Sequence, residues 1–162
     1  MKNIFTSLFI FLLININFAL ADTFINVCKR GPIGLKIKQI TGATSCQQVS
    51  MKKMSEITSL SLEHEEISSI PDFAFAGLTS VREINLSTNN IKQINPQTFM
   101  GLSSLEKLNL SDNYISSFEK DTFRSLSSLK MIDLSYNFVA EVSRSDLGLS
   151  EDVIIDGVGV NP

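Results

Sequence analysis

The residues in this chain that could do chemistry are few, and their spacing does not suit catalysis. There are two cysteines, Cys28 and Cys46, and a single histidine, His64, flanked by glutamates. A serine or cysteine nucleophile needs a histidine base oriented by a third group, and a zinc site needs three or four ligands. No Cys-x-x-Cys motif is present, and His64 with Glu63 and its neighbours is better explained as a solvated strand edge. We therefore expect no enzymatic activity, no metal and no cofactor.

The beginning of the chain predicts export. Residues 1–21 contain a basic residue, then an apolar run, and end in Ala-Leu-Ala, the pattern of a signal-peptidase cleavage site. Two asparagines interrupt the run, which falls short of the roughly 20 apolar residues that a spanning helix prefers. Export brings the chain into an oxidising compartment. There Cys28 and Cys46 are expected to form a disulfide that contributes about 3 kcal/mol to the free energy of unfolding.

The net charge narrows the classes of partner. The full chain carries −3, and removal of residues 1–21 takes away one lysine, which leaves −3 − 1 = −4. Such an acidic protein is poorly suited to nucleic acids or anionic membranes. No second apolar segment or lipidation motif follows. We expect a secreted, extracellular protein that binds no nucleic acid and does not insert into a membrane.

Aliphatic and aromatic residues recur along the chain at an interval of 24 residues. Within each repeat, alternation such as Ile84-Asn85-Leu86 sends aliphatic side chains to one face and polar ones to the other, as a β-strand requires. Strands of successive repeats can then stack in parallel over a continuous core. The repeating sets are Ile57, Leu60, Leu62, Ile67 and Ile70; Val81, Ile84, Leu86, Ile91 and Ile94; Leu105, Leu108, Leu110, Ile115 and Phe118; Leu129, Ile132, Leu134, Val139 and Val142; with further columns of Phe75, Phe99, Phe123 and Leu147, and of Leu78, Leu102 and Leu126.

A column of asparagines follows the strands. Asn89, Asn113 and Asn137 stand three residues after the second strand leucine, where their side chains can satisfy backbone groups that the turn leaves unpaired. The first repeat has Glu65 in this place, which is tolerable at an end of the stack where water reaches the carboxylate. We expect the asparagines to form a ladder.

Residues 81–91 (VREINLSTNNI) and 105–115 (LEKLNLSDNYI) follow the pattern L-x-x-L-x-L-x-x-N-x-L. In this the chain resembles the leucine-rich repeat family, in its typical extracellular subclass of 24-residue repeats. Toll-type receptor ectodomains and short secreted arthropod proteins, some from saliva or venom, have such repeats. The resemblance implies an α/β solenoid, a horseshoe segment with a parallel sheet on its concave face and an irregular or briefly helical convex side.

This architecture divides the chain into segments. Residues 1–21 are the expected signal peptide, and residues 22–56 an N-terminal cap that contains the disulfide. Family caps often have four cysteines, so this cap is a reduced version. Within it, the alternation of Ile33, Leu35 and Ile37 predicts a strand. Four repeats follow, at 57–80, 81–104, 105–128 and 129–152, and residues 153–162 form a partial fifth repeat.

The register of the last strand has two interpretations. Val153, Val158 and Asn161 continue the interval of 24, but Asp156 then falls on an aliphatic position. Alternatively, Ile155 and Val160 join Val158 in a slightly shifted strand. Without a cysteine-rich C-terminal cap, the edge of this strand is exposed or pairs with another chain.

In the family the concave face carries the partner, and here most of its outward positions are small and polar. Glu83 is expected to face Lys107, and Arg82, Glu106 and Lys130 alternate in sign along the rim; such pairs suit structural support. The C-terminal corner differs, because it gathers an exposed aromatic residue, an apolar residue and charges. The candidate partner-binding residues are Met131, Asp133 and Tyr136, with Lys107 and Asp112 beside them.

Two N-glycosylation sequons begin at Asn85 and Asn109. The repeat consensus itself creates such sequons, but export makes their modification possible. Glycans there would cover the middle of the concave face and move a partner toward the C-terminal strands or the convex side.

Together these features predict a secreted binding protein that recognises an extracellular protein or a pathogen-derived ligand. The likeness to Toll-type ectodomains implies a role in modulating Toll-like immune signalling. The alternative is a structural or assembly role, in which the C-terminal edge forms a homodimer or caps another solenoid.

Overall fold

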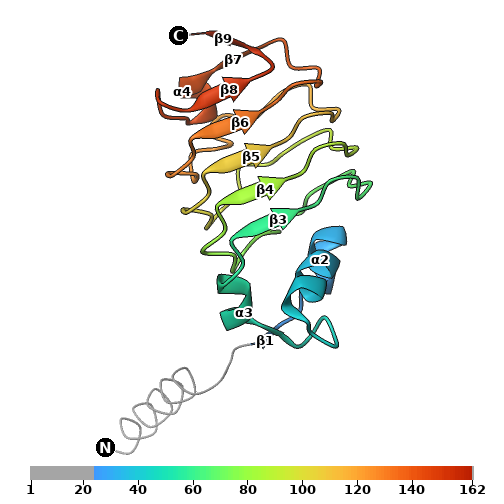
Figure 1. The fold of residues 1–162 in the computed structure, drawn as a ribbon. Helices are drawn as coiled ribbons and strands as arrows, with labels where there is room; N and C mark the ends of the chain where they lie inside the picture. The colour runs from blue at the N-terminus through green and yellow to red at the C-terminus, as the bar shows by residue number, and fades with distance from the viewer. Residues whose placement is uncertain (1–23, 162) are drawn as a thin grey trace, which may run out of the picture.

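A computed structural model describes residues 24–161, and in it the chain winds into a stack of coils around one parallel β-sheet. The strands of this sheet are β3 (Ser59–Ser61), β4 (Glu83–Asn85), β5 (Lys107–Asn109), β6 (Met131–Asp133) and β8 (Ile154–Asp156), paired in that order. Figure 1 shows them stacked along the long axis of the molecule, each followed by a loop that returns on the far side. The fold is the expected solenoid.

The interior of the stack is formed by the repeating columns. The middle residue of each of the first four strands, Leu60, Ile84, Leu108 and Ile132, is buried, while the residues on either side point outward. On the opposite wall Phe75, Phe99 and Phe123 are fully buried, with ring centroids 5.6 Å and 6.1 Å apart. Each coil alone could not bury its apolar side, so stacking supplies the core.

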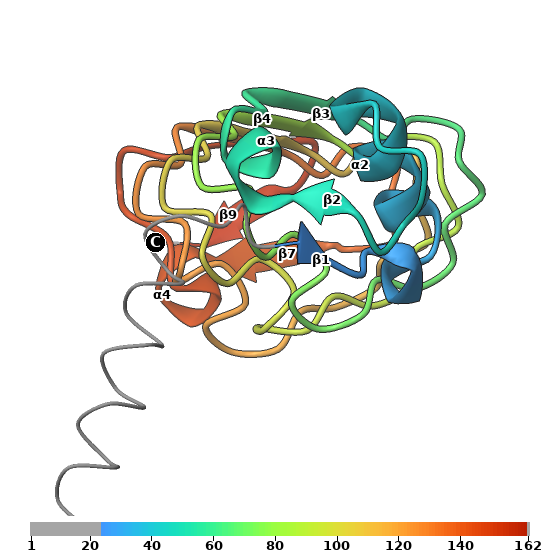
Figure 2. The same ribbon diagram turned by 90° about the horizontal axis from the view of Figure 1, so that it is seen from below.

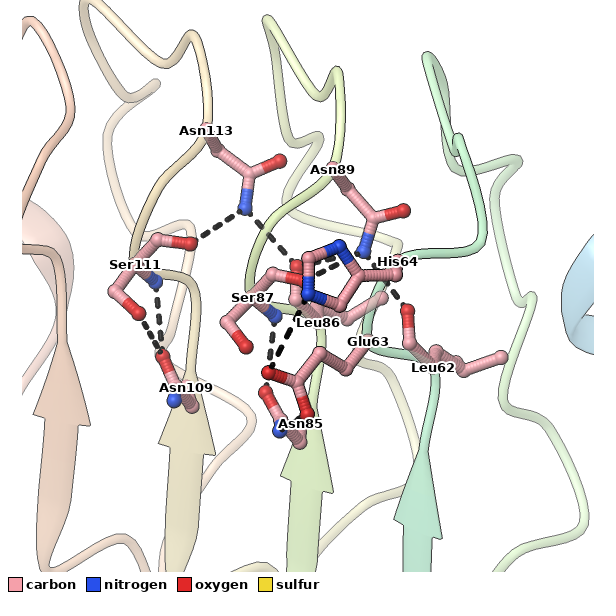
Figure 3. Close-up of polar contacts among 10 residues, drawn as sticks. All are labelled: Leu62, Glu63, His64, Asn85, Leu86, Ser87, Asn89, Asn109, Ser111 and Asn113. Atoms are coloured by element: carbon pink, nitrogen blue, oxygen red, sulfur yellow. Dashed lines mark hydrogen bonds and ion pairs between the residues drawn. The ribbon is translucent and has the colours of Figure 1, made fainter.

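The asparagine ladder forms as expected. The Nδ2 of Asn113 donates to the carbonyls of Leu110 in its own coil and Leu86 in the preceding one, at 3.1 Å and 3.0 Å. Its Oδ1 accepts from the backbone N–H of Ile91 at 3.0 Å. Asn89 and Asn137 bond in the same way. Each asparagine therefore ties a coil to the one before it (Figure 3).

The N-terminal cap contains a helix where the alternation of residues 33–37 predicted a strand. Its elements are β1 (Phe24–Ile25), η1 (Cys28–Arg30), α2 (Pro32–Thr41), β2 (Val49–Ser50), which pairs antiparallel with β1, and α3 (Met51–Ser55).

The strand prediction was wrong because Ile33 and Ile37, four residues apart, also share one face of a helix. Both are buried, whereas Leu35, which a strand would place beside them, is 57% exposed. Pro32 at the first helical position and Gly42 at φ +66° after the last favour the helix ends.

Two side-chain contacts fasten this cap to the repeats, and a disulfide closes the cap itself. Cys28 and Cys46 form a disulfide that closes the loop containing α2. The guanidinium of Arg30 donates to the carbonyls of Ala74 and Ala76 in the first repeat, and burial lowers its pKa from the ordinary value. Lys36 forms an ion pair with Glu65 at 3.2 Å, so the carboxylate in the asparagine position of the first repeat has a partner from α2. Figure 2 shows α2, β2 and α3 lying across the first coil.

The last coil is shorter than the others. After β6 come β7 (Glu141–Ser143) and the short helix α4 (Arg144–Leu147), then β8 and β9 (Gly159–Asn161), which pairs in parallel with β7. Ile155 pairs with Ile132, an interval of 23, so the uninterrupted 24-residue register is wrong at this strand. The shifted register places Ile155 correctly, but Val160 lies in β9 and not in the same strand. Because this coil is one residue shorter, Ile155 takes the aliphatic position in place of Asp156.

The predicted signal peptide lies outside the described residues. No helix between residues 24 and 161 has the length and apolar character needed to cross a membrane.

Candidate functional site

Parallel pairing arranges the outward side chains of the concave sheet in columns. The register aligns Ser59, Glu83, Lys107, Met131 and Ile154 in one column, and Ser61, Asn85, Asn109, Asp133 and Asp156 in the other. Neighbours within a column lie about 4.8 Å apart, the spacing of adjacent strands. The columns change from polar and neutral at β3 to apolar and acidic at β6 and β8, so the two ends of one sheet differ chemically.

A shallow hollow of about 230 Å³ lies on this face over β4, β5 and β6. Three candidate residues, Lys107, Met131 and Asp133, line it together with Glu83 and Asn109. The structure thus brings these three predicted residues together. The hollow combines an ammonium, a thioether and two carboxylates, a set that suits contact with a polar or charged side chain of a partner.

The two predicted charge pairings, Glu83 with Lys107 and the alternating charges of the rim, differ in whether ion pairs form. Glu83 and Lys107 are register partners, as expected, but they do not form an ion pair among the described residues. At the rim, Glu106 accepts from Lys130 on one side and Arg82 on the other. Hydrogen bonds from Lys130 and then from Arg82 lower the pKa of the Glu106 carboxyl below its ordinary value. The rim charges are satisfied within the protein, whereas the amine of Lys107 has no ion-pair partner within residues 24–161.

Each of the strands β4, β5 and β6 ends in the same side-chain cap. The Oδ1 atoms of Asn85, Asn109 and Asp133 each accept from the backbone N–H two residues later at 2.9 Å. Asp133 also accepts from the Ser135 hydroxyl at 2.6 Å. This hydrogen bond turns the chain out of the strand, and Figure 3 shows it at Asn85 and Asn109. The sequon asparagines therefore have a structural role whether or not they carry glycans.

Just past these caps, one residue of every full repeat adopts a left-handed backbone conformation. The φ angles of His64, Thr88, Asp112 and Tyr136 are +58°, +56°, +53° and +56°. In this conformation the N–H of Thr88 and of Asp112 each donate to the serine carbonyl of the next coil, at 3.0 Å and 2.9 Å. The side chains point away from the core, and that of Tyr136 is 83% exposed.

The structure therefore divides the five candidate residues between two places. Lys107, Met131 and Asp133 line the hollow, while Asp112 and Tyr136 occupy the turns beyond the strand ends. Asp133 ends β6 and Tyr136 lies in the turn three residues later, so they are at most about 10 Å apart along the chain. A single ligand could span both places, but the five residues do not share one pocket.

Two exposed aromatic residues were missed by the sequence reasoning. Tyr114 and Phe138 follow the ladder asparagines of repeats 3 and 4, and their rings stack at a centroid distance of 6.1 Å. They are 50% and 68% exposed. The repeat pattern contained the signal, because the position between the asparagine and the next aliphatic residue must point outward.

His64 lies on the first coil, two repeats before Tyr114. Its Nε2 is 4.0 Å from a carboxylate oxygen of Glu63, and both side chains are well exposed. Among residues 24–161 no group of three or more potential ligands is arranged to hold a metal ion.

Comparison with known proteins identifies the repeats. The leucine-rich repeat model matches residues 55–115 and 103–149. No curated protein sequence matches the chain.

Solved structures share the fold. An internalin, InlF of Listeria monocytogenes, superposes with a TM-score of 0.62 at 20% identity, over 76% of this chain and 36% of its own. TLR13, in a complex with ssRNA13, gives 0.57 at 32% identity, over 68% of this chain and 16% of its own. Toll, in the Drosophila Toll–Spatzle complex, gives 0.50 at 20% identity, over 57% and 14%. This chain therefore spans about a third or less of the length of these structures.

Proposed function

Because the chain belongs to the leucine-rich repeat family, whose domains generally mediate protein–protein interactions, we propose that it is a secreted module that recognises an extracellular protein or a pathogen-derived ligand. The observation that carries this proposal is that the outward side chains of the concave sheet change in chemical character from its N-terminal to its C-terminal end. Its C-terminal end presents Met131, Asp133 and Tyr136, with Lys107 beside them, while the N-terminal end presents small polar residues. Exposed aromatic and charged residues in one region are typical of binding hot spots.

Secretion is part of the same proposal. The disulfide between Cys28 and Cys46 supports it, since such bonds persist in oxidising compartments. The similarity to Toll-type ectodomains points the same way. Expression in a eukaryotic secretory host should release a protein that begins at Asp22, and mass spectrometry of its N-terminus tests this. Retention of residues 1–21 on the exported chain would contradict the cleavage site.

A role in Toll-like immune signalling rests on the same likeness. Toll is bound to Spatzle in the structure that this chain resembles, and TLR13 is bound to ssRNA13. A short solenoid with similar repeats could occupy a Toll ligand or a Toll ectodomain without signalling itself. Addition of the purified protein to a Toll reporter cell line should change the response to Spatzle; an unchanged dose–response curve would remove this role.

Glycosylation would restrict where a partner can bind. Asn85 and Asn109 lie in the outward column of β4 and β5, so glycans on them would project over the middle of the concave face. The C-terminal strands would remain open. Digestion of the secreted protein with an N-glycosidase should reduce its mass by two glycans, and the Asn85→Gln and Asn109→Gln variants should each lack one.

Capture experiments can test the proposed binding surface. Asp133→Asn removes the charge while keeping an acceptor for the Ser135 N–H, since asparagine fills this place in the two preceding repeats. The immobilised double variant Asp133→Asn with Tyr136→Ala should lose a ligand from extracellular fluid that the wild type and a Ser61→Ala control retain. A ligand held equally by all three would exclude this corner, and no enrichment over bare resin would refute the binding function.

A second candidate function, assembly through the C-terminal edge, is favoured by one observation. Among the described residues strand β8 pairs with β6 alone, and Ile154, its first residue, is 62% exposed. An unpaired parallel edge can receive another strand. Light scattering across a concentration series tests this: a dimer that Ile154→Lys dissociates supports the assembly role, and a strict monomer at high concentration rejects it.

A further inference from the structure

Three exposed aromatic side chains lie in the segments that follow strands β5 and β6. Tyr114 and Phe138 stack on each other, and Tyr136 precedes Phe138 by two residues in the same turn. The fold does not require rings here, because the same positions of repeats 1 and 2 hold His64 and Thr88, and Glu66 and Asn90. The turn backbone is nevertheless the same, since Thr88 and Tyr136 share a φ of +56°. The aromatic character is therefore local to two repeats and independent of the repeat architecture.

Carboxylates lie on β6, on the neighbouring strand β8 and in the turn before Tyr114. Asp133 and Asp156 are register partners on β6 and β8, which places two carboxylates on neighbouring strands and on the same face. Like charges directly opposite each other are unfavourable in a sheet. Within residues 24–161 neither carboxylate forms an ion pair, nor does that of Asp112 in the adjacent turn. Lys107 lines the hollow beside Asp133 without forming an ion pair among residues 24–161, so a cationic group supplied from outside would still find both carboxylates unneutralised.

The two features together specify the chemistry of the occupant. Aromatic faces attract cations, and the guanidinium of arginine both stacks on rings and bonds carboxylates in a bidentate manner. We propose that the surface formed by Tyr114, Tyr136 and Phe138 with Asp133 and Asp156, here called the aromatic–acidic surface, docks an arginine-bearing segment of a partner protein. The proposal rests on the binding function proposed above and names the class of partner.

The geometry suits an extended peptide. Asp133 ends β6 and Tyr136 lies in the turn three residues later, so the two residues are at most about 10 Å apart along the chain, a span that a short peptide can bridge. One arginine could bind the carboxylates while a neighbouring arginine or apolar side chain covers the rings. Lysine, a compact and strongly hydrated charge, satisfies only the electrostatic part of this arrangement. We therefore expect arginine to be preferred over lysine.

The protein carries its own reporter for this surface. It has no tryptophan and two tyrosines, Tyr114 and Tyr136, and both belong to the aromatic–acidic surface. Intrinsic tyrosine fluorescence of the unlabelled protein therefore reports on this site alone. The probe is a nonapeptide with three arginines among glycine and leucine, without aromatic residues, compared with its all-lysine and all-glutamate counterparts in buffer with 150 mM salt and EDTA.

The arginine peptide should produce a saturable change in tyrosine fluorescence, binding several-fold more tightly than the lysine peptide, while the glutamate peptide produces none. Phe138→Ala, which retains both tyrosines, should weaken binding about tenfold, and Asp133→Asn about fivefold. Two matched controls should stay within twofold of the wild type. Asn90→Ala changes the position of repeat 2 equivalent to Phe138, and Glu151→Gln removes one exposed charge before β8.

Several results would overturn the proposal. They are no saturable change up to 1 mM peptide, equal weakening by the control variants, or binding of the glutamate peptide. A fluorescence change on dilution without peptide would assign the surface to a second copy, and saturation by a neutral oligosaccharide in place of the peptide would assign it to a glycan. Capture of an extracellular ligand that is lost with Asp133→Asn and Tyr136→Ala, but unaffected by arginine peptide, would preserve the proposed function and reject this inference.

Discussion

Replacement of Asn113 by alanine should destabilise the protein through one specific orphaned group. Asn113 is 4% exposed and makes four hydrogen bonds. The three carbonyls to which it donates each keep a second donor, for example Leu110, which still accepts from Asn137 at 2.9 Å. The N–H of Ile91 keeps none among the described residues.

The magnitude follows from this single loss. A buried donor left without a partner costs about 1–3 kcal/mol, so we expect Asn113→Ala to lower the free energy of unfolding by about 2 kcal/mol. Asn137→Ala also removes a bond to a backbone N–H, that of Ile115, but Asn137 is only partly buried and water can replace its side chain. For that variant we expect about 1 kcal/mol or less.

Urea unfolding of the secreted protein, followed by far-ultraviolet circular dichroism, measures both effects as shifts of the midpoint at constant slope. Asn90→Ala, an exposed neighbour in the second repeat, is the control and should not change the midpoint measurably. A cost for Asn113→Ala no larger than that of Asn90→Ala, or a larger cost for Asn137→Ala, would refute the account of the ladder as a set of bonds to buried backbone groups.

Three further predictions concern the buried phenylalanine stack, the disulfide and the ion pairs of the rim. Phe99→Ala, which removes the central ring of the buried stack, should cost about 3–5 kcal/mol in urea unfolding; a cost below that of the Asn113 variant would contradict its place in the core. Cys46→Ser should lower the free energy of unfolding by about 3 kcal/mol under non-reducing conditions and have no effect once reductant is present. The ion pairs of Glu106 lower its pKa in the folded state, so their small stabilising effect is present above the unfolded pKa and is lost as the pH falls through the folded one. Glu106→Gln should therefore flatten the acid limb of the stability–pH curve, and an unchanged limb would show that the pairs contribute nothing.

Much of the solenoid could be read from the spacing of residues alone. Asn89, Asn113 and Asn137 were recognised as a ladder because each occupies the same environment, so one physical argument about one turn holds for all three. The phenylalanine stack and the parallel register of the sheet follow from the same periodicity. Because the local pattern repeats, it predicts contacts between residues that are far apart in the sequence.

The binding corner was only partly predictable. Lys107, Met131 and Asp133 share a hollow because strand columns are set by the repeat. The stacking of Tyr114 on Phe138 depends on which side chains happen to fill equivalent outward positions and on their rotamers, which the spacing does not describe. The same holds for Glu83 and Lys107, which face each other without forming an ion pair among the described residues.

The repeating part of the molecule thus follows from residue spacing: the interval of 24, the buried columns and the face on which polar residues lie. The conformation of the two ends depends on packing. Ile33 and Ile37 fit a strand or a helix equally well until packing against the first coil buries them and leaves Leu35 in solvent. At the other end, Ile155 and not Asp156 pairs with Ile132. At each end a segment packs against a single neighbouring coil, so its conformation is set by the particular surface it covers and not by a period.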